Sequence, residues 1–513
     1  MNHTHIYSTP SLVMKFATMA LVVTLLSGFA AQAQSITVNR NFSVNQDVPD
    51  RGQYVSTYQI GNAGLATISD VNVGLSLSSA SGSTMRLGQM YATVTVGTAS
   101  EGSRTAVLLN REGVSNTSAF GSALSSLNVT FDDSAATNIY NLTGSTGTYA
   151  ADGRIGVNPY GTRVAYNANQ VTAGLSALNG AWKDTWSLLV ADTQAGNRAQ
   201  LNSWSLSITG TAASSGTMDP GAGGTISGNG SGTETIGATV SSSGIGANAV
   251  SIAASAGQVL DLTGGITGGG DFKKTGEGVM RIGDSSGFTG TLELQGGKAV
   301  VDGTMNSASK VLVGNGATVG GTGTVGALEV ASGGAIGPGN SPGQLNVAGN
   351  ATWAGGASYE WEINNFLGSA GTNWDFLNIG GGLNITATSG SKFLIDVVSL
   401  LADNSQGNAR NFFPTYNYSI AIATAAGGIT GFSQDAFQLD TSAFSNPVTF
   451  ASWANQPTFT PGYFSLGLSA DGKSINLNYA AAIPEPSSLS LVVLGLATVL
   501  AKRRRKSGAT QIF

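Results

Sequence analysis

The sequence predicts an all-β protein in which an antiparallel β-sandwich is followed by a glycine-rich β-solenoid, an aromatic-rich β cap and a terminal hydrophobic helix. Glycine accounts for 73 of the 513 residues, about twice its usual share of roughly 7%. Charged residues make up 10% of the chain, against about 25% in ordinary soluble domains. The apolar runs are short and alternate with polar residues between Gly, Asn and Ser turns, a pattern typical of strands.

The N-terminus carries a predicted secretory signal peptide over residues 1–33. Lys15 precedes the apolar run FATMALVVTLLSGFA, which ends at the small residues Ala31 and Ala33. A short apolar segment closed by an A-x-A site is typical of a segment that signal peptidase removes. A retained membrane anchor is the alternative, although a full span needs about 20 apolar residues.

The C-terminus carries a second predicted processing segment, residues 484–506. Pro484, Glu485 and Pro486 precede the apolar run LSLVVLGLATVLA, and a basic cluster over 502–506 follows it. The cluster should stay on the cytoplasmic side of the membrane. This order resembles a PEP-CTERM sorting signal. The resemblance implies that Pro484, Glu485 and Pro486 form the recognition motif of an exosortase, a membrane sorting enzyme of bacteria that make surface polysaccharide. The tail SGATQIF departs from the family pattern, and a simple tail anchor remains the alternative.

Composition excludes several kinds of chemistry. The chain has no cysteine, and its two histidines, His3 and His5, lie within the predicted signal peptide. The mature chain would therefore lack thiol catalysis, a Ser–His–Asp triad and ordinary zinc sites. Loss of both ends lowers Lys plus Arg from 23 to 17 against 28 Asp plus Glu, a net charge of about −11. An acidic surface disfavours nucleic acid as a partner.

Residues 36–210 form the predicted sandwich. Strand-like runs such as ISDVNVGLSLS, YATVTVG and WSLSITG are separated by turns, and Trp182, Trp186 and Trp204 are expected to pack in the core. The strings DVPDRGQYVSTYQI, FDDSA and LSALNGAWKDTWSLLVADTQAGNRAQLNSWSLSITG resemble the P domain (P/Homo B domain) of proprotein convertases. That resemblance implies an eight-stranded jelly roll, often with structural calcium, that usually follows a subtilisin-like catalytic domain.

The same resemblance points to three acidic residues as calcium ligands. Asp132, Asp133 and Asp192 match positions where acidic residues cluster in the family. Calcium prefers six to eight oxygen ligands, but paired aspartates at the end of a strand more often form a turn or a cap. Calcium binding therefore stays open. Because only the predicted signal peptide precedes this segment and no histidine remains, the peptidase activity linked to P domains is not expected here, and we expect no enzyme.

Residues 211–235 are rich in Gly and Ser and predict a flexible linker, and residues 236–350 predict a β-solenoid. Strands of three to five residues, each closed by glycine, recur there and predict five or six coils of about 20 to 25 residues. The string GGDFKKTGEGVMRI resembles the autotransporter-associated β-strand repeat, with Met280 where Leu is usual, which implies a right-handed solenoid. The carboxylates of this segment show no paired spacing typical of a lyase or glycosidase.

Residues 351–480 hold most of the remaining aromatic residues and predict a β-sheet cap or a continuation of the solenoid. Such an end needs a cover because a terminal coil exposes unpaired strand edges. Asp471-Gly472 is a strong hairpin signal. Aromatic pairs can bind sugars, but a role in the buried core is favoured.

Together these features predict a non-catalytic exported protein with a structural or adhesive role. The C-terminal helix would anchor it transiently in the inner membrane before it reaches the cell surface or the extracellular matrix. Its expected partners are signal peptidase, an exosortase and, as an open candidate, extracellular polysaccharide. The alternative is an accessory calcium- or carbohydrate-binding module that partners a separate subtilisin-like serine endopeptidase.

Overall fold

The computed structural model describes residues 35–60, 64–81, 84–114, 118–155, 168–228, 232–449 and 459–484. Both predicted processing segments lie outside these residues, except for Pro484. Strands make up 53% and helices 5% of the structure, with no helix of seven residues or more, so the all-β prediction is confirmed. Among the described residues, no helix is long and apolar enough to span a membrane. The short 3-10 helices are η1 Leu87–Gln89, η2 Ala99–Glu101, η3 Ile139–Asn141, η4 Ala168–Gln170, η5 Leu175–Leu178, η6 Gly246–Asn248 and η7 Gln434–Ala436.

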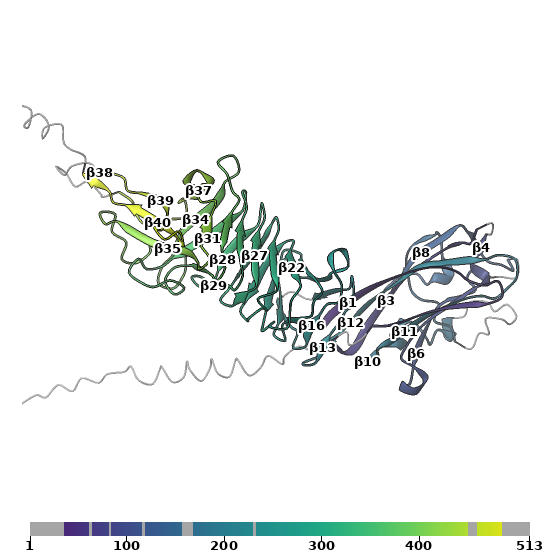
Figure 1. The fold of residues 1–513 in the computed structure, drawn as a ribbon. Coiled ribbons are helices and arrows are strands. Elements are labelled where there is room, and N and C mark those ends of the chain that lie inside the picture. The colour runs from purple at the N-terminus through teal and green to yellow at the C-terminus, as the bar shows by residue number, and fades with distance from the viewer. Residues whose placement is uncertain are drawn as a thin grey trace, which may run out of the picture.

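The N-terminal part is a β-sandwich of eight main strands (Figure 1). One sheet has the order β8-β3-β12-β1 and the other β6-β5-β11-β2, with antiparallel neighbours throughout. The strands are β1 Ser35–Asp47, β2 Gln53–Gln59, β3 Leu65–Ser79, β5 Met90–Val96, β6 Arg104–Asn110, β8 Ser126–Phe131, β11 Thr185–Asp192 and β12 Ala199–Ala212. Shorter strands at the periphery are β4 Met85–Arg86, β7 Ala123–Leu124, β9 Thr146–Tyr149 and β10 Gly180–Ala181.

The sandwich core forms because apolar residues alternate along each strand. Trp186 and Trp204 are buried as predicted, whereas Trp182 is only half-buried. The indole nitrogen of Trp204 donates to the Ser56 hydroxyl at 3.0 Å, which satisfies the one polar atom of that ring. Phe42 packs against Trp204 of the same sheet, with ring centroids 4.4 Å apart, and stacks on Tyr58 of the other sheet, with centroids 4.2 Å apart. Large aromatic rings therefore join the two sheets.

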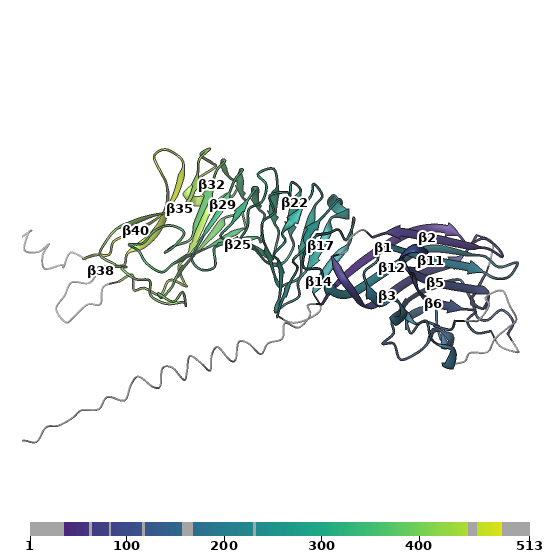
Figure 2. The same cartoon turned by 90° about the horizontal axis from the view of Figure 1, so that it is seen from below.

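The second part is a solenoid-like stack of parallel strands with three sides (Figures 1 and 2). The first side contains β14 Thr225–Gly228, β17 Val250–Ala253, β20 Phe272–Thr275, β22 Thr291–Leu294, β24 Lys310–Val313, β27 Ala327–Val330, β30 Ala351–Trp353, β33 Leu383–Ile385 and β36 Ile429–Thr430. The second contains β15 Gly232–Thr235, β18 Gln258–Leu262, β21 Val279–Ile282, β23 Gly297–Val301, β25 Ala317–Gly321, β28 Ala335–Pro338, β31 Ser358–Ile363, β34 Phe393–Ser399 and β37 Phe437–Asp440. The third contains β13 Thr217–Met218, β16 Thr239–Ser241, β19 Ile266–Thr267, β26 Thr324–Val325, β29 Gln344–Val347, β32 Phe376–Ile379 and β35 Tyr418–Ala425.

These strands correct two predicted boundaries. The predicted linker at 211–235 is wrong, because the described part of this segment contains the end of β12 and then β13, β14 and β15. Its few apolar residues, Met218 and Ile226, both point inward and are fully buried. Glycine and serine fill the turns and the outer face, and for this reason the composition of the segment resembles that of a linker although it forms a coil. The second side is a nine-stranded parallel sheet that ends at Asp440, so the coils continue well beyond residue 350.

Strand β1 joins the sandwich to the stack because it is paired along both edges. Residues Ile36 to Asn39 face β12 on one side and β14 on the other. Val38 is therefore opposite both Ile208 and Ile226, and all three are fully buried. Farther along β1, Arg40 donates from Nη1 to the carbonyl of Ala222 at 3.2 Å. The result is one 15-stranded sheet that runs through both parts.

One column of inward side chains follows this sheet from the sandwich into the stack. From Ile226 it passes in register to Ile252, Lys274 and Leu294. Lys274 is the exception in an otherwise apolar column, and it is fully buried. Its ammonium donates to the carbonyls of Gly276, Gly278 and Gly296, the last two at 2.7 and 2.8 Å.

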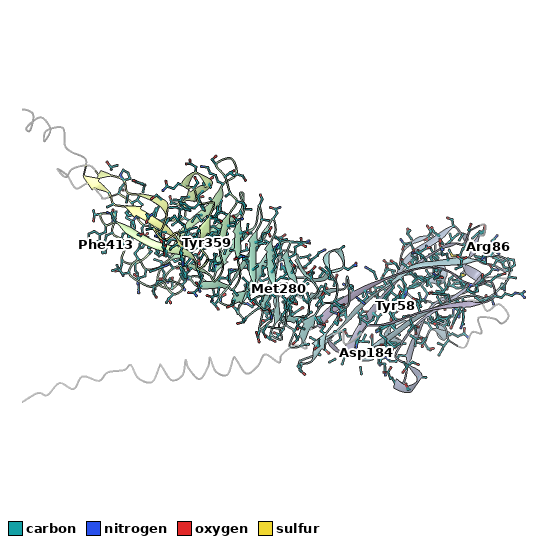
Figure 3. The ribbon with its side chains drawn as sticks, in the orientation of Figure 1. Tyr58, Arg86, Asp184, Met280, Tyr359 and Phe413 are labelled. Atoms are coloured by element: carbon teal, nitrogen blue, oxygen red, sulfur yellow. The ribbon has the colours of Figure 1, made fainter. Side chains whose placement is uncertain are left out.

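The Lys274 ammonium therefore ties together the corners of two successive coils. Gly297 makes room for it: the residue has φ +61°, and a Cβ there would lie 2.5 Å from Lys274 Nζ. Burial lowers the pKa of Lys274 to about 8. Met280, at the repeat position where Leu is usual, is also fully buried, as is Tyr359 farther along the stack (Figure 3).

The far end of the stack is closed by an antiparallel hairpin. Strands β39 Tyr463–Leu468 and β40 Ser474–Ala480 extend the third side, because β40 pairs with β35 and β39 pairs with β40. The predicted Asp471-Gly472 turn joins them, with Gly472 at φ +69°. Strands β38 Phe459–Thr460 and β41 Ile483–Pro484 form a further short pair. Below the hairpin lies a cluster of aromatic rings: Phe366, Phe412, Tyr418, Phe444, Phe464 and Tyr479.

The C-terminal aromatic residues thus take both predicted roles, cap and core. Trp353, Tyr359 and Trp361 are fully buried within the coils, and Trp353 stacks on Phe393 with ring centroids 4.6 Å apart. Residues 351–480 thus contain both strands of the stack and the hairpin at its end. A minority of its aromatic residues are exposed, among them Phe413 at the tip (Figure 3).

Replacement of Lys274 by Met tests the corner tie. It would leave the buried carbonyls of Gly278 and Gly296 without their donor, at a cost of about 1–3 kcal/mol each. It would also remove a buried charge whose penalty, from the fall of its pKa from 10.5 to about 8, is about 3 kcal/mol. We expect a net loss of about 1–2 kcal/mol in the free energy of unfolding at pH 7, measured by urea unfolding followed by tryptophan fluorescence.

The half-buried neighbour gives the matched control, Lys273→Met, which should change stability little. The pH dependence is a second readout. The unfolded chain holds the Lys274 proton up to about pH 10, whereas the folded protein loses it near pH 8. Stability of the wild type should therefore gain from this group as the pH rises from 8 to 10, and Lys274→Met should lack that gain. Equal stability of the two variants at pH 7 would contradict the corner tie.

Candidate functional sites

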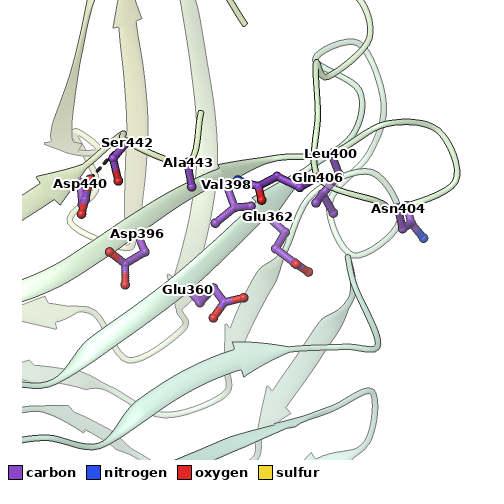
Figure 4. A pocket seen from close by; sticks show the side chains of 10 residues that line it. All are labelled: Glu360, Glu362, Asp396, Val398, Leu400, Asn404, Gln406, Asp440, Ser442 and Ala443. Carbon is purple, nitrogen blue, oxygen red and sulfur yellow. Dashed lines mark hydrogen bonds between the residues drawn. The ribbon is translucent and has the colours of Figure 1, made fainter. Parts of the chain in front are cut away.

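An acidic pocket opens on the second side of the stack, near its C-terminal end (Figure 4). Its volume is about 480 Å³. Three carboxylates, Glu360, Asp396 and Asp440, occupy the same register on the adjacent strands β31, β34 and β37. Neighbouring strands are about 4.8 Å apart, so the three charges form a row. The other side chains around the pocket are those of Glu362, Val398, Leu400, Asn404, Gln406, Ser442 and Ala443.

The carboxylates in this row have different proton affinities. Burial raises the pKa of Asp396, and the neighbouring Asp440 and Glu360 raise it further. The pKa of Asp440 is lowered because the backbone and side chain of Ser442 hydrogen-bond to its carboxylate, with the backbone N–H at 2.8 Å. Burial also raises the pKa of Glu362. The pocket is therefore a concentration of negative charge in which repulsion favours a proton on the central residue.

This pocket was not predicted from the sequence. Its three aligned carboxylates are far apart in the sequence: Asp396 follows Glu360 by 36 residues, and Asp440 follows Asp396 by 44. Only the parallel register of the strands brings them together. The negative charge of the pocket favours cations, but its carboxylate oxygens are not arranged around a common point. Among the described residues, no group of three or more His, Cys, Asp and Glu side chains has the arrangement of a metal site.

The predicted calcium ligands are likewise not assembled into one group. Asp132 accepts the backbone N–H of Ser134 at 2.7 Å, which is a local turn. Asp133 accepts the N–H groups of Leu175 and Ser176, at 3.0 and 2.6 Å, and so caps the short helix η5. These two residues take the turn and cap roles that paired aspartates usually have.

Asp192 lies at the end of β11, in the other sheet, and is fully buried. One carboxylate oxygen accepts the N–H of Gln194 at 3.1 Å, and the other has no hydrogen-bond partner in the described part of the chain. Burial raises its pKa to about 6, and Asp50 adds to the rise. Asp192 is therefore the one predicted ligand with a buried oxygen that has no hydrogen-bond partner in the described residues.

A buried ionic cluster holds a loop against the sandwich. Arg154 forms a two-point contact with Asp152, at 2.6 Å from Nε and 2.5 Å from Nη2, and both residues are fully buried. Glu112 lies beside them and accepts the N–H of Asn110 at 2.9 Å. Burial and the nearby Asp152 raise the pKa of Glu112 well above its ordinary value. These hydrogen bonds connect groups of the chain itself, whereas Glu112 Oε2 is buried with no hydrogen-bond partner in the described residues.

Of the predicted processing residues, the structure describes only Pro484. Pro484 is the last described residue and ends β41, which pairs with β38. Glu485, Pro486, Ala31 and Ala33 lie outside the described residues. A scan against protein-family models and a search of curated proteins found no match for this chain.

Replacement of Asp192 by Asn tests whether this carboxylate is a structural burden or a metal ligand. The folded protein keeps the Asp192 proton up to about pH 6, whereas the unfolded chain loses it near pH 4. The wild type should therefore lose stability as the pH rises from 4 to 6. In the presence of a chelator at pH 7, we expect Asp192→Asn to be more stable by about 3 kcal/mol, measured by urea unfolding.

The exposed Asp435 supplies the control substitution, Asp435→Asn, which should have little effect. The same melts with millimolar calcium decide the calcium question. A wild-type melting temperature that rises with calcium, in contrast to that of Asp192→Asn, would assign this residue as a ligand. If Asp192→Asn were less stable than the wild type in chelator, the proposal that the buried Asp192 carboxylate lowers the stability of the folded protein would be disproved.

Proposed function

We propose that the mature chain is a non-catalytic exported protein with a structural or adhesive role at the cell surface or in the extracellular matrix, processed by signal peptidase and an exosortase. The observation that carries this proposal is the order of Pro484, Glu485 and Pro486, an apolar segment and a basic cluster directly after the folded body. The last described strand, β41, ends at Pro484. A cut in this motif would release the whole described β-structure intact.

The surface of the stack supports a role based on many weak contacts. On its third side, uncharged side chains repeat in register: the Asn378 amide donates to Asn346 at 3.0 Å, and Thr424 donates to Asn378 at 3.4 Å. Side chains in such a polar ladder hydrogen-bond to one another along the stack and form an outer face of amides and hydroxyls. Repeated weak contacts add through effective concentration when two such surfaces meet.

The finer assignments of fold and family belong to the same proposal. Eight main strands in two four-stranded sheets, in the order β8-β3-β12-β1 and β6-β5-β11-β2, are what a jelly roll of two Greek keys requires, and this supports the resemblance to a P domain. Lys274, Gly276 and Gly278 match the Lys and Gly positions of the autotransporter-associated repeat, and the hydrogen bonds from the Lys274 ammonium to both glycine carbonyls support that resemblance. These likenesses support an exported, repetitive scaffold with a right-handed solenoid.

The intact mass of the protein from the native cell-surface fraction tests the proposal. We expect a chain that begins near Gln34 and ends within or next to Pro484–Pro486. Such a mass would establish processing at both ends. A chain that still ends at Phe513 would instead identify the C-terminal segment as a retained membrane anchor, and the proposed sorting would then be wrong.

A further inference from the structure

A straight groove crosses the outer face of the sandwich sheet formed by β1, β12, β3 and β8. It has a volume of about 270 Å³ and is lined by three consecutive residues from each strand. The middle residue of each triplet, Phe42, Trp204, Leu75 and Val129, is paired in register with the next and is buried in the core. The floor of the groove is therefore the backbone of this row.

Two rows of outward side chains form the walls. One wall consists of Asn41, Ser205, Gly74 and Thr130, and the other of Ser43, Ser203, Ser76 and Asn128; each set is in register across the four strands. The walls stand two residues apart along each strand, about 7 Å, and four strands give the groove a length of about 14 Å. Gly74 interrupts the first wall, and a Cβ there would lie 2.2 Å from the Ser205 hydroxyl.

The side chains of both walls have no hydrogen-bond partner within the described chain, although polar side chains elsewhere on these strands do. Thr37 and Thr209, on the same sheet, share a hydrogen bond of 2.6 Å, and Ser78 donates to Asn202 at 3.0 Å. None of the seven wall side chains takes part in a side-chain hydrogen bond of the described structure. Their donors and acceptors all face the open groove.

We propose that this groove binds an uncharged polysaccharide chain. Its walls supply hydroxyl groups, which both donate and accept, and amides with two donors and an acceptor. Sugar hydroxyls need the same mixture along both edges of an extended chain. No charged side chain lines the groove, so it offers no counter-charge to an acidic polysaccharide. The proposal deepens the adhesive role proposed above by naming the ligand class and the binding surface.

The test uses gel retardation of the purified protein by neutral polysaccharides, with dextran, a mixed-linkage β-glucan and galactomannan as probes. It requires no particular C-terminus, since the chain can be taken from the surface fraction or, if an anchor is retained, from mild detergent. Failure of the sorting proposal is therefore distinguishable from failure of this one. The variant carries Asn41→Ala and Asn128→Ala, one exposed amide from each wall. At least one probe should retard the wild type, and the variant should bind it at least about fivefold more weakly.

A matched control removes the same kinds of groups far from the groove. Ser419→Ala with Asn478→Ala deletes a hydrogen-bonded pair on the hairpin sheet at the other end of the molecule, and its binding should equal that of the wild type. Melting temperatures establish that all variants are folded. The proposal is overturned if none of the probes retards the wild type, or if the groove variant binds as tightly as the wild type. Retardation by gelatin and by none of the polysaccharides would assign the groove to extended peptides and would also overturn it.

Discussion

The double pairing of β1 is the constraint on which the rest of the structure depends. A strand at the edge of a sandwich and a strand at the end of a solenoid each expose unpaired backbone groups, which favour aggregation. Here Ile36 to Asn39 cover both edges at once, because β12 and β14 occupy opposite sides of the same four residues. The sandwich is therefore the N-terminal cap of the stack. The short strand β14 is held in position by β1, which the sandwich core already fixes.

This arrangement also determines where functional surfaces can lie. The inward column from Val38 through Ile226 and Ile252 continues the sandwich core into the stack, so the two parts share one hydrophobic interior. The groove lies on the opposite face of the same sheet, on residues whose neighbours along the strand are buried in that interior. The buried core thus positions a polar surface without side-chain hydrogen bonds within the walls. On this account the stack separates the groove from the processing motif at the C-terminus.

The sequence was sufficient for the fold class, the two β-rich parts, the burial of Trp186 and Trp204 and the hairpin at Asp471-Gly472, because each depends on local alternation or turn chemistry. It was insufficient for features that depend on the register between strands distant in the sequence. The segment 211–235 has the composition of a linker, yet its few apolar residues lie at inward positions of a coil. Glu360, Asp396 and Asp440 form one row only because β31, β34 and β37 are parallel and in register. The groove walls are likewise ordinary Ser, Thr and Asn residues until four strands align them.

Native-state amide hydrogen exchange in increasing denaturant tests most directly whether β1 joins the sandwich and the stack into one unit. Amides that open together share one free energy of opening. We expect the amides of β12, β1, β14 and β17 to lose protection with the same free energy and the same dependence on denaturant. If the amides of β14 and β17 opened at a distinctly lower free energy than those of β12, the stack would be an independent neighbour of the sandwich, and the central role of β1 would be contradicted.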